Sequence, residues 1–172
     1  LSLTKVNENT WSIKNPSNKP FTISYDIKTT RKFVANSYVD EEHAYIIPAN
    51  SFLYVDGHLD LPATVKVDKG QKWQKIATGL DLVREGEYTA KDFDILYDSP
   101  ILIGDLEELP SFNVRGIKHR FTGYKIGEFD KKQFMSKLEK MVESAVNVIG
   151  DIPFDEYTFI AIGPGRGGIE HL

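Results

Sequence analysis

The sequence predicts a mainly β protein: an antiparallel β-sandwich followed by the first helix and strand of an α/β domain. Short alternating segments separated by turn residues fill residues 1–100, which is typical of a sandwich. One amphipathic helical pattern follows over residues 130–149, and a compact apolar segment comes next at 156–162. With 172 residues, the chain can bury one core and part of a second.

The expected strands of the first hundred residues rest on alternation and on their flanking turns. The clearest is 21–27, where Phe21, Ile23, Tyr25 and Ile27 share one face, after a turn rich in Asn and Pro at 15–20. Strands are also predicted over residues 10–13, 33–39, 44–48, 51–55, 63–67, 88–90 and 93–97. A hairpin over 112–124 that turns at Arg115-Gly116 completes the series.

The helix over residues 130–149 has clear signals at both ends. Asp130 is a suitable N-cap with Gln133 three residues later, and Gly150 and Pro153 end the pattern. Its apolar positions recur at helical spacing, which predicts one buried face. They are Phe134, Leu138, Met141, Val142, Ala145, Val146 and Ile149.

The chain is expected to divide into two parts near residue 126. Residues 1–126 would form the sandwich, and residues 127–172 would begin a second domain with the helix, a strand at 156–162 and a Gly-rich turn at 163–168. The apolar run in the strand predicts burial on both faces.

Composition excludes several classes of function. The net charge is −4 and the basic residues do not cluster, so we expect no nucleic-acid partner. There is no cysteine, which excludes disulfides, a cysteine nucleophile and cysteine-ligated zinc. No apolar run is long enough to span a membrane.

The polar side chains offer few candidates for catalysis or metal binding. No H-E-x-x-H motif is present, so we expect no metal site and no catalytic residue in this chain. We expect His43 on a solvated polar face and His119 at a surface or edge position of a strand. Asp105, Glu107 and Glu108 form an acidic loop that suits either acid–base chemistry or, more simply, a charged surface.

The last residues carry the most informative pattern. Gly163, Gly165, Gly167 and Gly168 could cradle a phosphate, but an acidic residue follows where the anion would lie and the Walker Lys-Ser/Thr is absent. A plain glycine loop remains an alternative. A carboxylate at Glu170 presented by such a turn suits a cation, such as the free amino terminus of a peptide.

Several segments match those of a known family in their order and spacing. They are Thr10-Trp11-Ser12-Ile13, the segment from Phe21 to Asp26, Ala77-Thr78-Gly79-Leu80, Tyr97-Asp98-Ser99-Pro100-Ile101, Gly116-Ile117-Lys118-His119-Arg120 and Gly167-Gly168-Ile169-Glu170-His171. Together they resemble the glycyl aminopeptidases, gluzincin zinc peptidases that often carry a PDZ domain. This resemblance implies an N-terminal β domain joined to a thermolysin-like catalytic domain. It also suggests a periplasmic or exported bacterial protein.

The resemblance implies a substrate-binding role for the final segment. In the related alanyl aminopeptidases, a Gly-x-Met-Glu-Asn segment lies on an edge strand, and its Glu binds the substrate's α-amine. Glu170 would be this amine anchor, and Gly167 and Gly168 would let the substrate pair with the strand edge. This sequence has Ile169 at the Met position of that segment and His171 at the Asn position. Because His171 replaces Asn, it would either orient the loop or contact the substrate.

The resemblance also implies that this chain lacks part of the enzyme. The zinc ligands of the family and its opening strands are not found, so the chain is expected to be truncated at both ends and inactive alone. Zinc, the rest of the catalytic domain and a peptide with a free amino terminus are the partners expected for the full-length protein. The alternative is a β-sandwich binding or adaptor module of an inactive peptidase-like protein. A carbohydrate-binding sandwich is conceivable, although core packing explains its aromatic residues more simply.

Overall fold

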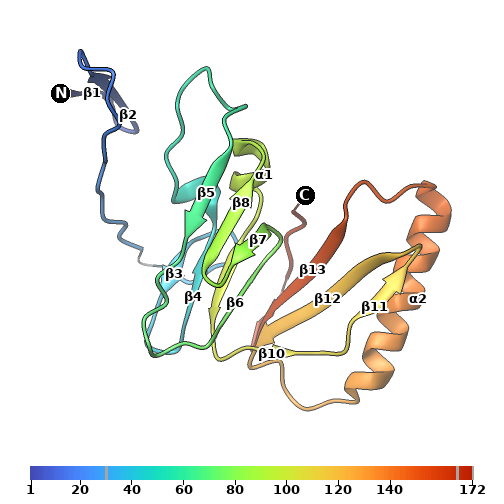
Figure 1. The fold of residues 1–172 in the computed structure, drawn as a ribbon. Coiled ribbons are helices and arrows are strands. Elements are labelled where there is room, and N and C mark those ends of the chain that lie inside the picture. Colours follow the sequence, from blue (N-terminus) through green and yellow to red (C-terminus); the bar gives the residue numbers. More distant parts are fainter. Residues whose placement is uncertain (30, 166, 172) are drawn as a thin grey trace.

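The computed structural model describes residues 1–29, 31–165 and 167–171, and its sheets are stacked in layers with a long helix on one outer face (Figure 1). The strands are β1 (Ser2–Asn7), β2 (Thr10–Lys14), β3 (Tyr38–Val39), β4 (His43–Ile46), β5 (Ala63–Lys66), β6 (Lys75–Thr78), β7 (Asp81–Arg84), β8 (Glu87–Ala90), β9 (Ile101–Gly104), β10 (Glu107–Glu108), β11 (Phe112–Val114), β12 (Ile117–Tyr124) and β13 (Glu156–Ile162). The helices are α1 (Phe93–Tyr97), α2 (Lys131–Ile149) and the 3-10 turn η1 (Pro48–Asn50).

Two antiparallel sheets form a sandwich, which confirms the predicted fold class. One sheet has the order β3-β4-β9-β6 and the other β5-β8-β7. Their facing side chains form the first core, because alternate residues of a strand point to the same face. Its buried members are Ala44, Val65, Leu80, Tyr88, Ala90, Leu96, Ile101 and Ile103.

The other face of the β3-β4-β9-β6 sheet is also covered. Tyr45 and Leu102, which are opposite each other on β4 and β9, contribute to a second core with Tyr124 at the end of β12. Ile160 and Ile162 of β13 pack against the same cluster. This second core therefore joins the sandwich to the sheet that follows it in the sequence.

The third sheet is mixed and carries α2. Strands β10 and β11 pair antiparallel with β12, and β13 pairs parallel with β12 on the other side. A parallel pair needs a crossover connection, and α2 supplies it. The helix packs against the outer face of this sheet through a third core that includes Phe112, Val114, Met135 and Val146.

The ends of α2 agree with the sequence prediction. The Asp130 carboxylate accepts a hydrogen bond of 2.9 Å from the backbone N–H of Gln133. Gly150 adopts a left-handed conformation with φ of 95°, and its N–H donates to the Val146 carbonyl. These two contacts satisfy backbone groups that the helix itself leaves unpaired.

The buried face of α2 differs from the predicted one. Met141 and Ile149 were expected in the core, but they are 65% and 74% exposed, and Met135 is buried instead. Ala145 is exposed as well. A flat sheet can contact only one side of a helix. The third sheet therefore buries a narrower side of α2 than the apolar pattern predicts, and the remaining apolar residues are exposed.

Three predicted strands are absent. Residues 21–27 are not a strand because no neighbouring strand pairs with them, and their apolar side chains are exposed. Residues 51–55 follow η1 as a turn and an irregular segment. Residues 93–97 form α1 instead, because the Asp92 carboxylate caps the helix by accepting from the N–H of Ile95.

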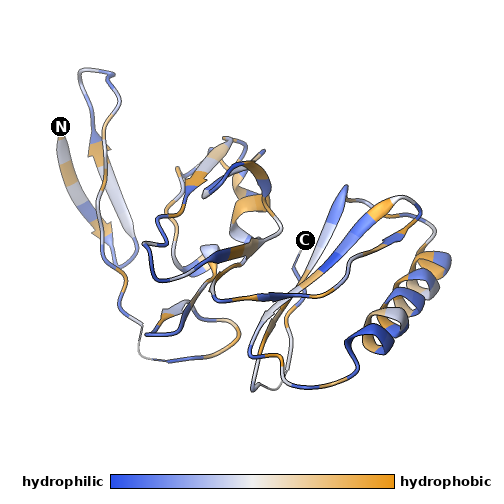
Figure 2. Ribbon diagram, turned by 60° about the horizontal axis from the view of Figure 1, so that its bottom comes forward, coloured by the Kyte–Doolittle hydropathy of each residue, from blue (hydrophilic) through white to orange (hydrophobic). Residues whose placement is uncertain are grey.

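Other predicted elements are shorter or less buried than expected. Only Tyr38–Val39 of the segment 33–39 forms a strand. Strand β13 occupies the predicted residues, but it is half-buried and not buried on both faces. The hairpin β1–β2 is almost fully exposed and projects from the sheets although it carries apolar residues (Figure 2).

The division of the chain near residue 126 stays a prediction. Strand β12 lies before that position and β13 after it, and Lys118–Tyr124 pairs with Glu156–Ile162. The third sheet therefore includes residues from both sides of the expected boundary.

Candidate functional site

The Gly-rich segment leaves the end of β13 through a turn that two glycines make possible. The N–H of Gly163 donates to the Tyr124 carbonyl at 2.8 Å, and a Cβ at this residue would lie 2.2 Å from the Lys125 carbonyl oxygen. At Gly165, a Cβ would lie 2.8 Å from the Ile162 carbonyl oxygen. Both distances are too short for a side chain, so these glycines are required by the close approach of the backbone.

Gly167 and Gly168 are in open surroundings. Gly167 has φ of 94°, and a Cβ at either residue would have no neighbouring atom within 4 Å. Crowding therefore does not explain these two glycines. Both residues are exposed.

Glu170 lies in an exposed position near the start of β13. The segment turns back after β13 and ends beside the sandwich (Figure 1). Burial, and after it the nearby Glu170 carboxylate, raises the pKa of the Tyr157 hydroxyl. Among the described residues, no basic side chain pairs with Glu170, and the residue is exposed.

His171 contacts a residue for which the sequence predicted no role. Its Nδ1 lies 2.8 Å from Oδ1 of Asp98, which follows α1 in the sandwich. The two side chains are 18% and 21% exposed. The sequence signal for Asp98 was its place in the segment Tyr97-Asp98-Ser99-Pro100, which is part of the family resemblance. The sequence does not show that this segment lies beside the final residues, because that contact exists only in the folded chain.

The predicted site residues are therefore adjacent but differ in exposure. Gly167, Gly168 and Glu170 are exposed, Ile169 is 43% exposed, and His171 is half-buried against Asp98. The segment 167–171 is not assigned as a strand, in contrast to the edge strand that the family resemblance implies.

Two other histidines are buried, which corrects their expected surface positions. His119 is 1% exposed, its Nδ1 lies 3.0 Å from the Ile117 carbonyl oxygen, and its ring stacks on Phe112. His43 is buried, and its Nε2 lies 3.0 Å from the Tyr38 hydroxyl. Both are enclosed because neighbouring layers cover them.

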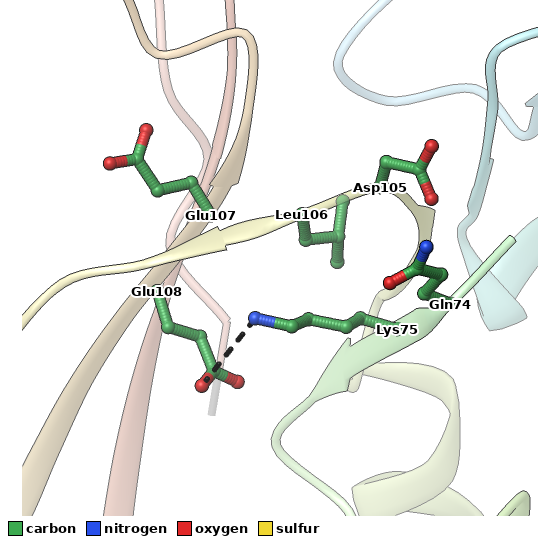
Figure 3. Close-up of a pocket in the computed structure, with 6 residues that line it drawn as sticks. All are labelled: Gln74, Lys75, Asp105, Leu106, Glu107 and Glu108. Carbon is green, nitrogen blue, oxygen red and sulfur yellow. Dashed lines mark ion pairs between the residues drawn. The ribbon is translucent and has the colours of Figure 1, made fainter.

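The acidic loop borders an open hollow of about 550 Å³ lined by Gln74, Lys75, Asp105, Leu106, Glu107 and Glu108 (Figure 3). Glu108 lies 3.9 Å from the Lys75 ammonium group, and Glu107 pairs with Lys131 of α2. Two of the three carboxylates thus have basic partners, which favours the charged-surface interpretation.

No set of ligands for a metal ion is found in the part of the chain that the structure describes. Nowhere in residues 1–29, 31–165 and 167–171 do three His, Asp or Glu side chains come together as a metal site would require. The described residues therefore do not fit the zinc of the resembled family. Neither α1 nor α2 has the length and apolar composition needed to cross a membrane, as judged over the same residues.

The residues of the sandwich match a known protein family. The Peptidase M61 N-terminal domain matches residues 1–105, which is more than half of the chain. The chain belongs to the Peptidase M61 N-terminal domain family. The matched residues include both sheets of the sandwich and end at the start of the connection to the third sheet.

A solved structure supports a relationship to peptidases over a longer part of this M61-family chain. It is the crystal structure of an aminopeptidase N family protein from Idiomarina loihiensis, with 30% sequence identity and a TM-score of 0.69. The similarity covers 78% of this chain but 24% of that protein, so the chain spans about a quarter of its length. No match was found among proteins with curated functions.

Proposed function

We propose that the chain is the N-terminal part of a zinc aminopeptidase of the glycyl aminopeptidase group, and that Glu170 binds the free amino terminus of a peptide substrate. The observation that carries this proposal is the exposed Glu170 carboxylate, which has no basic partner among the described residues, in a chain of the M61 family.

The surroundings of Glu170 support a peptide ligand. Gly167 and Gly168 leave the preceding backbone open, so an extended substrate could donate and accept hydrogen bonds there. The protonated α-amine would then reach the carboxylate three residues after the first glycine. A charge-assisted hydrogen bond of this kind is stronger than a neutral one.

The chain supplies binding and orientation in this proposal, and it is inactive alone. No cluster of three metal ligands is found among the described residues, and in this proposal the zinc ligands of the enzyme lie in its remaining residues. We therefore assign no catalytic step to any residue of this chain.

The test is an aminopeptidase assay of the full-length protein with zinc, on short peptides with free and with acetylated amino termini. In Glu170→Gln and Glu170→Ala, we expect kcat/KM for free-amine peptides to fall roughly tenfold to a hundredfold, because a charge-assisted hydrogen bond is lost. Glu143→Gln changes an exposed carboxylate on α2 and should behave as wild type.

An active enzyme whose preference for free amines is unchanged in both Glu170 variants would refute the role of Glu170. A full-length protein that folds and binds zinc but cleaves neither kind of peptide would favour the alternative, a binding or adaptor module.

A further inference from the structure

A polar contact between residues far apart in the sequence ties the segment that carries Glu170 to the sandwich. Oδ1 of Asp98 lies 2.8 Å from Nδ1 of His171, and the two residues are 73 positions apart. Most of both side chains is shielded from solvent. Shielding strengthens a hydrogen bond to a carboxylate, because water competes less for the partners.

Asp98 is presented by a well-packed part of the sandwich. The next residue, Ser99, is buried, and its hydroxyl donates to the Ile95 carbonyl of α1 at 2.7 Å. Strand β9 then begins with Ile101, which is almost completely buried. The backbone on both sides of Asp98 is thus fixed by contacts that do not involve the final segment.

Among the described residues, the final segment has few other contacts that fix its position. Residues 167–171 form no strand, and Gly167 and Gly168 have no packing neighbours where a Cβ would be. Among contacts between described residues, the Asp98–His171 pair is the polar side-chain contact found for this segment. His171 is thus a described side chain through which the sandwich holds this segment, and it is the residue next to Glu170.

The contact also favours one tautomer of the neutral imidazole. A carboxylate can only accept, so Nδ1 of His171 must carry the hydrogen and donate it to Asp98. Nε2 is buried and has no hydrogen-bond partner among the described residues. Asp98 thus holds one tautomer and one ring orientation, as carboxylates do for other histidines at binding sites.

We infer that Asp98 is a positioning residue for the amine-binding segment. Its carboxylate holds the His171 ring against the sandwich, and His171 in turn places the Glu170 carboxylate for the substrate amine. The substrate part of this inference rests on the proposed function, whereas the anchoring of the segment does not. Asp98 acts through His171 and does not touch the substrate.

The anchoring is tested on the 172-residue chain by ring ¹⁵N NMR of His171 in wild type, Asp98→Asn and Asp98→Ala. In wild type we expect the Nδ1–H tautomer, and in both variants a shift of population toward Nε2–H, the commoner form of a free neutral imidazole. Asp94→Asn changes an exposed carboxylate on the same helix and should leave the ring signals unchanged. Unchanged signals in both Asp98 variants would overturn the inference.

The positioning role is tested in the full-length protein. In Asp98→Asn, we expect KM for free-amine peptides to rise about tenfold, equivalent to about 1.4 kcal/mol, with kcat changed less than about twofold. Asp98→Glu keeps the carboxylate and should recover part of the loss. A purely structural defect would lower kcat as well and would not be rescued by Glu.

The two tests separate this inference from the proposed function. If the Asp98 variants alter the ring signals and Glu170→Gln leaves the preference for free amines intact, the contact between Asp98 and His171 is supported and the proposed amine site is refuted. If Glu170→Gln abolishes the preference but Asp98→Asn keeps the wild-type KM, the positioning role fails and the amine site stands.

Discussion

At the residue scale, the environment of His43 is expected to make the stability of the sandwich depend on pH. Its ring stacks on Tyr124 with 4.2 Å between centroids, and its Nε2 faces the Tyr38 hydroxyl. Burial lowers the pKa of His43 from its ordinary value of 6.5, against the opposing charge of Asp40. The charged side chains that act on it are Asp40, Lys32, Glu42 and Lys125.

Protonation of His43 is therefore expected to destabilise the fold. Because its pKa is lower in the folded than in the unfolded state, the unfolded state binds more protons as the pH falls below about 6.5, and the free energy of unfolding decreases. Urea denaturation between about pH 8 and pH 5.5 should show this decrease in wild type and a flatter dependence in His43→Gln. The exposed His58→Gln should keep the wild-type slope. Equal slopes for wild type and His43→Gln would contradict the prediction.

Asp40 affects the stability of the fold in a different range of pH. Burial alone would raise the pKa of its carboxyl, but the hydrogen bonds from Lys32 and from the backbone of His43 and Glu42 lower it overall. Its contribution to stability is therefore lost only as the pH falls below the ordinary value of 3.8. The effect of His43 can be measured separately at higher pH.

At the scale of elements, α2 shows which side of an amphipathic helix is used. Met135 is 5% exposed and belongs to the third core, whereas Met141, six residues later, is largely exposed. The same residue type thus occupies both environments in a single helix, which provides a matched comparison.

We expect Met135→Ala to lower the free energy of unfolding by about 2–5 kcal/mol, because it leaves a cavity between α2 and the third sheet. Met141→Ala should change the free energy by less than about 0.5 kcal/mol, since it removes no buried contact. Urea denaturation followed by circular dichroism measures both. Similar losses for the two variants would show that Met141 is covered in solution and that the observed face of α2 is wrong.

At the scale of the whole molecule, the second core couples the sandwich to the third sheet. Leu102 is completely buried between them, with Tyr45 and Ala77 from the sandwich and Tyr124 from β12. The exposed ion pair of Lys125 with Glu42 also crosses this junction, but such pairs contribute little because water screens them. Apolar packing therefore carries the coupling.

Leu102→Ala should destabilise both parts of the molecule together, by about 2–5 kcal/mol. Fluorescence of Trp73, which packs against the first core, reports on the sandwich in a Trp11→Phe background, and circular dichroism at 222 nm reports mainly on α2. We expect both midpoints to fall by the same amount. Leu82→Ala, at an exposed position of β7, is the control. A shift seen by only one probe would show that the two parts unfold independently.

The sequence by itself determined the elements whose signals are local. The caps at Asp130 and Gly150, the turn at Arg115-Gly116 and the strand at 156–162 follow from residues a few positions apart, and each is present. The sandwich class follows in the same way from repeated alternation. The residues of the final segment could be proposed as a site from the sequence because the glycines and Glu170 lie close together in the chain.

Only the tertiary structure decided the features that depend on a partner. Residues 21–27 alternate but form no strand because no strand of the described residues pairs with them, and Met141 is exposed because the sheet covers the other side of α2. Asp98 and His171 are 73 residues apart, so no local pattern could bring them together. A strand, a buried face and a shared hydrogen bond each require a second surface, and the fold determines where that surface lies.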